Sequence, residues 1–274
     1  MMRAFRSEWS RLMRPGTILG GAGTIVFSAI LVTGILFAIA KPAADITRED
    51  LVAGRGTITR EMLQGNDGMV VAFALTGQLI GIVALVIFAQ NLGAEYSHGT
   101  LKALLSREPR RLHLLGGKAA ALALFVGLAI LLAFVAQSLL AIVMAAARGI
   151  PATAWFKMAG LKVAFELLLR VLGAALAWGV IGLLLAILLR ASAPAIGIGL
   201  GYTVVAEGLI SLAFNQGAKY LPGRVLSSFV TWGAAQPGRP ADLSGPMAAV
   251  LLLLYSGVML AIALTLFKNR DVQG

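Results

Sequence analysis

The sequence contains no cysteine, only two histidines, and few charged residues, which make up 13% of its 274 positions. The absence of cysteine excludes disulfide bonds, thiolate metal sites and cysteine nucleophiles. Soluble domains carry about 25% charged residues, so a chain this poor in charge is not expected to fold in water. Hydrophobic residues account for 59% of the chain. The composition therefore predicts a polytopic membrane protein.

Six apolar runs are long enough to cross a bilayer, whose hydrocarbon core of about 30 Å needs roughly 20 helical residues. They cover Thr17–Ala40, Met69–Ala89, Ala119–Ala147, Val171–Leu189, Pro194–Phe214 and Met247–Phe267. Lipid tolerates only helices or closed barrels, and these runs are too long and continuous for barrel strands. We expect an all-α fold of six transmembrane helices in one domain, 1–274, with both termini on the same side. Ser192, before Pro194, predicts the N-cap that separates the fourth and fifth spans.

Residues 1–15 combine basic and apolar side chains at helical spacing. Phe5, Trp9, Leu12 and Met13 fall on one face, and Arg3, Arg6, Arg11 and Arg14 lie opposite. This pattern predicts an amphipathic helix along the inner membrane surface, with an ordinary basic flank as the alternative. The apolar run that follows, about 24 residues, is longer than the 7–15 residues of a signal sequence core, so we expect an uncleaved anchor.

Basic residues favour one orientation in the membrane. With the N-terminus inside, they are about twice as dense in the inner loops as in the longer outer loops. We therefore expect a plasma-membrane protein with both termini in the cytoplasm. The net charge of +11 is spread over loops on both sides and forms no single stripe. This distribution favours contact with membrane lipid headgroups over nucleic acid.

The external loop 215–246, which precedes the last span, contains a short apolar pattern. Val225, Leu226, Phe229 and Val230 repeat at i, i+1, i+4 and i+5. The spacing predicts a short helix that rests on the outer leaflet or dips into it. A loop without regular structure is the alternative.

Polar residues inside the spans are candidates for a translocation pathway. Glu207 is the only acidic residue deep in an apolar run, where burying its charge is costly. It could bind a cationic group or respond to protons, or it could bond a neighbouring helix near the outer interface. Gln78 and Gln137 are weaker candidates, because amides often only hold helices together. Small-xxx-small spacing predicts close helix contacts at two pairs, Gly77 with Gly81 and Gly197 with Gly201, within the chain or, as the alternative, at a dimer interface.

The sequence carries no pattern typical of an enzyme. His98 and His113 form no His-Glu-x-x-His zinc pair. The string 116–118 resembles part of a phosphate loop, but Leu112 replaces its first glycine and Ala119 replaces the magnesium-ligating Ser or Thr. We therefore expect no catalytic residue, metal or cofactor in this chain. If ATP drives transport, another polypeptide hydrolyses it.

The polar segment 90–118 between the second and third spans predicts a short cytoplasmic helix. Leu101, Leu104 and Leu105 occupy i, i+3 and i+4, after a turn at Gly99 and a cap at Thr100. Such a helix can transmit a push from a soluble partner into two spans.

At these residues the sequence resembles the type-two ABC exporter permeases. The pattern comprises Glu95, Gly99-Thr100-Leu101, Ser106-Arg107, Arg110-Arg111 and Gly117-Lys118. The resemblance implies that 90–118 is a coupling loop for a cytoplasmic ABC ATPase, which binds ATP and magnesium. It also implies a second permease copy or a sister permease, and export of an amphipathic or hydrophobic drug, peptide or lipid-like substrate. The implied coupling residues are Glu95, Tyr96, Gly99, Thr100, Leu101, Lys102, Leu104 and Leu105. A secondary carrier or channel that works without an ATPase is the alternative.

Overall fold

The computed structural model describes residues 2–46, 58–101, 104, 110–214, 217–234 and 242–269. Helix α1 (Met2–Leu12) precedes a first span built from α2 (Pro15–Thr17), η1 (Ile18–Ala22) and α3 (Gly23–Ile39). The following spans are α6 (Val71–Ser97), α8 (Arg111–Ala147) and α9 (Met158–Leu189). The fifth combines α10 (Ser192–Gly201), η3 (Tyr202–Ala206) and α11 (Glu207–Ala213), and the sixth is α13 (Gly245–Asn269). Short elements η2 (Ala43–Asp45), α5 (Arg60–Leu63), η4 (Ala218–Tyr220) and α12 (Pro222–Val230) lie between them.

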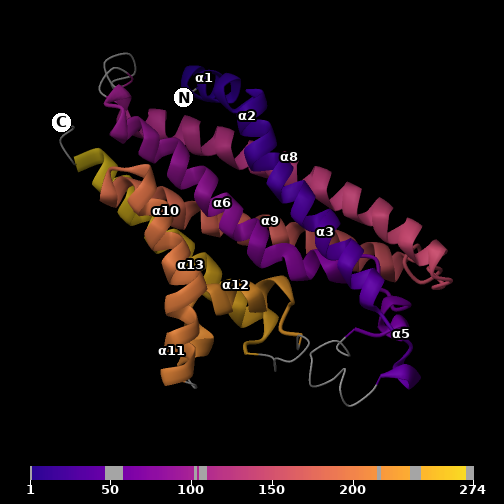
Figure 1. Ribbon diagram of the computed structural model, residues 1–274. Helices are drawn as coiled ribbons and strands as arrows, with labels where there is room; N and C mark the ends of the chain where they lie inside the picture. The colour runs from indigo at the N-terminus through magenta and orange to yellow at the C-terminus, as the bar shows by residue number, and fades with distance from the viewer. Residues whose placement is uncertain are drawn as a thin grey trace.

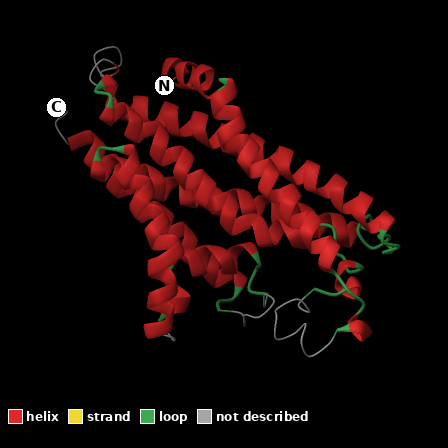
Figure 2. Cartoon of the chain, in the orientation of Figure 1, coloured by secondary structure: helices red, strands yellow, loops and turns green. Residues whose placement is uncertain are grey.

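All six expected spans are present as helices that are long and apolar enough to cross a membrane. Figure 2 shows that regular structure in the described residues is helical throughout. The predicted all-α fold is confirmed, and the chain has the architecture of a multi-pass membrane protein. Figure 1 places α1 and the end of α13 at the same end of the bundle. There Arg111 Nη1 donates a hydrogen bond to the Lys268 carbonyl oxygen at 3.2 Å.

Three helices extend beyond the apolar runs that predicted them. Helix α6 continues through residues 90–97, α8 includes 111–118, and α9 starts at Met158 instead of Val171. Most of the predicted loop 90–118 is therefore helix. Within this segment Glu95 near the end of α6 pairs with Lys118 in the first turns of α8. In α9 the i, i+4 pairs of Glu166 with Lys162 and Arg170 support the added turns.

Helix α6 lies at the centre, where it packs along α9 and also contacts α3 and α10. Glycines of α6 allow close contacts, because a Cβ at Gly81 would overlap the Trp178 ring of α9 and one at Gly77 would lie 3.2 Å from Val230 Cγ1 of α12. The predicted close contacts at this pair are confirmed. The predicted contact within the chain at Gly197 and Gly201 is wrong, since in the described structure a Cβ at either would meet no atom within 4 Å. The dimer interface that the same spacing allows stays a prediction.

The fifth and sixth spans lie at the periphery of the bundle and leave most of their surface exposed. Only 17% of the apolar stretch is buried in the α10–α11 and α13 spans, compared with 56% in α6 and α9. Large side chains such as Leu212 and Leu253 are exposed there, as expected for surfaces that contact lipid. Ser192 is the first residue of α10, and the N-cap is Ala191, with no side-chain bond. The predicted cap is therefore wrong by one position, at a point where α10 lies directly against Gly93 of α6.

The predicted helix before the last span is α12, which starts with Pro222 at its first position. Its apolar face, with Val225, Leu226 and Val230 buried, packs against α13, α9 and α6. The protein itself therefore covers the face that we expected to meet the outer leaflet.

Candidate functional site

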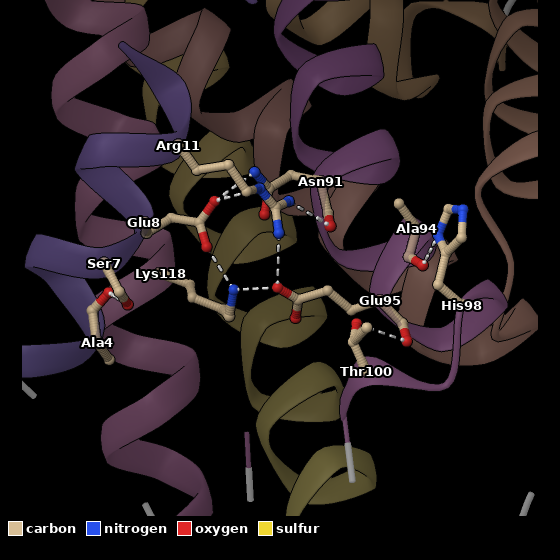
Figure 3. A network of polar contacts seen from close by, with 10 residues as sticks. All are labelled: Ala4, Ser7, Glu8, Arg11, Asn91, Ala94, Glu95, His98, Thr100 and Lys118. Atoms are coloured by element: carbon tan, nitrogen blue, oxygen red, sulfur yellow. Dashed lines mark hydrogen bonds and ion pairs between the residues drawn. The ribbon is translucent and has the colours of Figure 1, made fainter. Parts of the chain in front are cut away.

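The end of the bundle that holds α1 contains a polar network formed by Glu8, Arg11, Asn91, Glu95 and Lys118 (Figure 3). Lys118 Nζ donates to Glu8 Oε2 and to Glu95 Oε1. Arg11 Nη1 donates to Glu95 Oε1 at 3.0 Å, and Arg11 Nε lies 3.4 Å from Glu8 Oε1. Asn91 Nδ2 donates to Glu8 Oε1 at 2.7 Å. Together these contacts join α1, α6 and α8.

The polar network is buried and electrically balanced. Glu8, Glu95 and Lys118 are 3%, 2% and 5% exposed, whereas the Arg11 side chain is 38% exposed. Two carboxylates face two cations, so the sum of their charges is zero. Breaking a buried pair by removing one partner costs about 3–5 kcal/mol, because the charge left behind has lost its counter-ion. The three helices are therefore tied together by interactions that are costly to separate.

The side of α1 that is buried against the bundle is not the apolar side that the sequence predicts to face the membrane. Ala4, Glu8 and Leu12, at i, i+4 and i+8, are buried against the bundle. Phe5 and Trp9 are half-buried and stack on each other with ring centroids 6.1 Å apart. Helix α1 is amphipathic, as expected, but its buried side is centred on an acidic residue that pairs with α8. The assignment of the apolar face is corrected accordingly.

Glu8 titrates in an unusual setting. Burial raises the pKa of its carboxyl, but Lys118, Asn91 and Arg11 stabilise the charged form and lower the pKa below its ordinary value of 4.5. The net direction is downward, which keeps Glu8 ionised and paired at neutral pH.

Directly beyond Glu95, the chain forms an exposed tip made of residues 97–100. Gly99 has φ +66°, a left-handed conformation that favours glycine. Thr100 and Leu101 are helical, and Thr100 Oγ1 donates to the Glu95 carbonyl oxygen at 3.4 Å. The predicted cap at Thr100 involves residues 102 and 103, which lie outside the described residues. The tip is thus bonded to the end of α6.

The other predicted coupling residues lie around this tip. Leu101 is buried at 1% exposure, and Tyr96 and Leu104 are half-buried against the core. Lys102 and Leu105 lie outside the described residues. The structure therefore brings Glu95 and Leu101 into the interior and leaves Gly99 and Thr100 accessible.

Sequence reasoning missed Glu8 and Asn91. The available signals were the single acidic residue in a basic N-terminal segment, three positions before Arg11, and the i, i+4 spacing of Asn91 and Glu95. Lys118, which we had compared with a phosphate-loop lysine, lies inside α8 and binds the two carboxylates.

A cavity of about 470 Å³ lies between α6, α9, α12 and the fifth span. Gln78 and Glu207, two of the three candidate pathway residues, both line it. Gln137 lies elsewhere, where its Oε1 accepts from Thr33 Oγ1 at 3.3 Å and its Nε2 donates to Ser138 Oγ at 2.8 Å. Gln137 therefore connects α3 with α8, the helix-holding role that we had given as the alternative for amides.

Residues 25–273 match the sequence model of the DUF2705 family, whose description is "Protein of unknown function". None of the curated proteins matches the chain. The matched region includes the cavity and the α6 and α8 residues of the polar network, whereas Glu8 and Arg11 of α1 lie before it.

Proposed function

We propose that this chain, which belongs to the DUF2705 family, is the permease subunit of an ATP-driven exporter whose ATPase is a separate cytoplasmic polypeptide. The observation that carries the proposal is the polar network, which joins three helices directly behind an exposed tip. The tip follows Glu95, the residue at which the sequence resembles the coupling loop of type-two ABC exporter permeases. The geometry supports a docking point that transmits movement.

Movement at the tip has a short path into the bundle. Residues 97–100 continue directly from α6, and Thr100 is bonded to the backbone of Glu95. The Glu95 carboxylate in turn binds Lys118 of α8 and Arg11 of α1. A push on the tip is therefore shared among α1, α6 and α8, and these helices move as one unit.

In this proposal the α1 end of the bundle faces the cytoplasm of a plasma-membrane protein, the orientation favoured by its basic residues. ATP and magnesium bind the partner ATPase. The engagement of Lys118 with two carboxylates supports this division of labour, since the lysine is occupied within the fold. A second permease copy or a sister permease completes the pathway, and the cargo is amphipathic or hydrophobic.

A single-cysteine experiment tests the proposal, because a chain without native cysteine can be labelled at one chosen site. Thr100→Cys places the thiol on the tip, and Thr153→Cys places it between α8 and α9; both positions are exposed. Each variant is treated with a maleimide photo-crosslinker in native membranes. We expect an ABC ATPase attached at position 100 and absent at position 153.

The proposal is contradicted if neither position captures an ATPase, or if both positions capture the same proteins. The chain would then be better described as a secondary carrier or channel that works without ATP hydrolysis.

A further inference from the structure

A groove between the first span and α6 lies beside the polar network at the α1 end. Its volume of about 640 Å³ falls within the roughly 300–1,000 Å³ typical of ligand pockets. The wall formed by α6 and its C-cap is a single helical face, made of Val83, Val86, Ile87, Gln90, Asn91, Ala94, Glu95 and His98. At about 1.5 Å per residue this face is roughly 20 Å long. That length matches the thickness of one membrane leaflet with its headgroups.

The groove changes from apolar to polar along this face. Val83, Val86 and Ile87 lie inside the apolar run of the second span, whereas polar side chains follow from Gln90 to His98. The polar part lies toward the α1 end, and the apolar part lies toward the middle of the membrane. A phospholipid in one leaflet presents its headgroup and its acyl chains in the same order.

The first span leaves the apolar part of the groove open. It lines this part with Gly20 and Gly21 of the π-helical segment Ile18–Ala22. A Cβ at Gly21 would lie 3.3 Å from Ile87 Cδ1, which places this stretch against the apolar part of α6. Gly20 is exposed, and a Cβ there would meet no atom within 4 Å in the described structure. Because neither glycine projects a side chain, the groove has room for an apolar ligand.

The polar part of the groove carries one positive charge that the described residues leave unbalanced. Arg11 and Glu95 line it but belong to the polar network, whose charges sum to zero. Arg14 also lines it, is exposed, and makes no side-chain hydrogen bond or ion pair with any described residue. Basic pockets between transmembrane helices bind anionic lipid headgroups. With His98 neutral, the lining residues favour a ligand with a single negative charge.

Two buried acceptors in the groove wall call for hydrogen-bond donors. Asn91 and Glu95 are 8% and 2% exposed, and both line the groove. Asn91 Oδ1 and Glu95 Oε2 have no hydrogen-bond partner among the described residues. Leaving buried polar atoms without partners is costly, so such atoms indicate a missing donor. The two residues lie one turn apart on the same face of α6, which suits a ligand with more than one hydroxyl group.

We propose that this groove binds an anionic phospholipid whose headgroup carries hydroxyl groups, taken from the leaflet at the α1 end. The acyl chains lie along Val83 and Gly20, and the phosphate diester pairs with Arg14. The headgroup hydroxyls donate to Asn91 Oδ1 and Glu95 Oε2. The lipid joins the first span to α6 beside the polar network. It is a bound component of the protein and not the exported cargo, and its binding requires no ATPase.

The test uses radiolabelled dioleoyl phosphatidylglycerol and the purified full-length protein, washed free of native lipid in detergent micelles. Bound lipid is separated by gel filtration and measured as its mole fraction in the micelles rises. We expect saturable binding that Arg14→Gln weakens by at least about fivefold, the scale of one basic side chain facing an anionic headgroup. Arg14→Lys keeps the charge and should retain binding. Arg6→Gln, the same change at an exposed position of α1 outside the groove, should leave binding unchanged.

Three unlabelled competitors separate the parts of the ligand. Dioleoyl phosphatidylethanol has the same charge and chains but no headgroup hydroxyl, so it should compete at least about threefold less well than phosphatidylglycerol. Phosphatidylcholine, which has no net charge, should compete at least about fivefold less well. Glycerophosphoglycerol, the headgroup without acyl chains, should not compete. Equal competition by phosphatidylethanol would overturn the hydroxyl-bearing class, and equal competition by glycerophosphoglycerol would overturn the lipid in favour of a soluble phosphodiester.

A second pair of variants tests the apolar part of the groove. Gly20→Phe places an aromatic ring there, and Gly197→Phe places one on the fifth span. A Cβ at either position meets no atom within 4 Å in the described structure, so both variants should fold. Only Gly20→Phe should weaken lipid binding. Equal affinity of wild type and Arg14→Gln, or of the two phenylalanine variants, would overturn the inference.

Discussion

Replacement of Lys118 by methionine tests whether the polar network holds the α1 end together. Methionine keeps much of the side-chain length but removes the charge that lies between Glu8 and Glu95. The network then has two buried carboxylates and only Arg11 to balance them. We expect Lys118→Met to lower the free energy of unfolding by about 3–5 kcal/mol, the usual cost of breaking a buried ion pair.

A double-mutant cycle isolates the charge effect from the change in packing. Glu8→Gln alone leaves one excess positive charge, whereas Lys118→Met with Glu8→Gln leaves Arg11 and Glu95 in balance. The double variant should therefore be less destabilised than the sum of the two single variants, by about 1–3 kcal/mol for residues in one network.

The assay is equilibrium unfolding in mixed micelles, with circular dichroism as the probe. The matched control is Lys162→Met, because Lys162 lies 3.8 Å from Glu166 in a pair whose side chains are 73% and 46% exposed. That surface pair should contribute less than about 1 kcal/mol. The buried-network reasoning is refuted if Lys118→Met and Lys162→Met lower the free energy of unfolding by equally small amounts. It is also refuted if the losses of the two single variants in the cycle add up to the loss of the double variant.

Two further predictions concern pH and packing. Because the pKa of Glu8 is lowered in the fold from 4.5, the unfolded state binds more protons at acid pH, so the stability that Glu8 contributes is present above 4.5 and lost as the pH falls below it. Unfolding midpoints from about pH 7 to about pH 3.5 should fall less steeply in Glu8→Gln than in wild type, and parallel curves would contradict this. Gly81→Ala should lower the free energy of unfolding by about 1–3 kcal/mol, because the new Cβ overlaps the Trp178 ring. Gly197→Ala should leave it unchanged, because Gly197 faces open space in the described structure. Similar unfolding midpoints for the two variants would show that the α6–α9 contact is looser than described.

The number and order of the spans could be predicted because length and apolarity alone define a membrane crossing. The ends of α6 and α8 could not, because an apolar run stops at the first charges, while the helices continue where those charges have partners. Lys118 lies 110 positions from Glu8, and only the folded chain brings them together. A prediction made from one segment of the sequence at a time therefore assigns residues 90–97 and 111–118 to a loop.

The same limit applies to the candidate sites. Glycine spacing identified α6 as a close-packed helix, but it gave the same signal for Gly197 and Gly201, which face open space in the described structure. Glu207 was identifiable as an isolated acid in an apolar run. Its direction could not be predicted, because a π-helical turn changes which side chains share a face.

Co-purification tests the central claim, coupling of this permease to an ATPase, most directly. The wild type is purified in mild detergent from its native host beside Gly99→Val and Gly149→Val. Both glycines have nearly the same left-handed φ, +66° and +65°, and open surroundings, so each substitution carries a similar backbone strain of about 1–2 kcal/mol. The account predicts a stoichiometric ABC ATPase with wild type and Gly149→Val, reduced only with Gly99→Val; no ATPase with the wild type, or equal recovery from both variants, would contradict it.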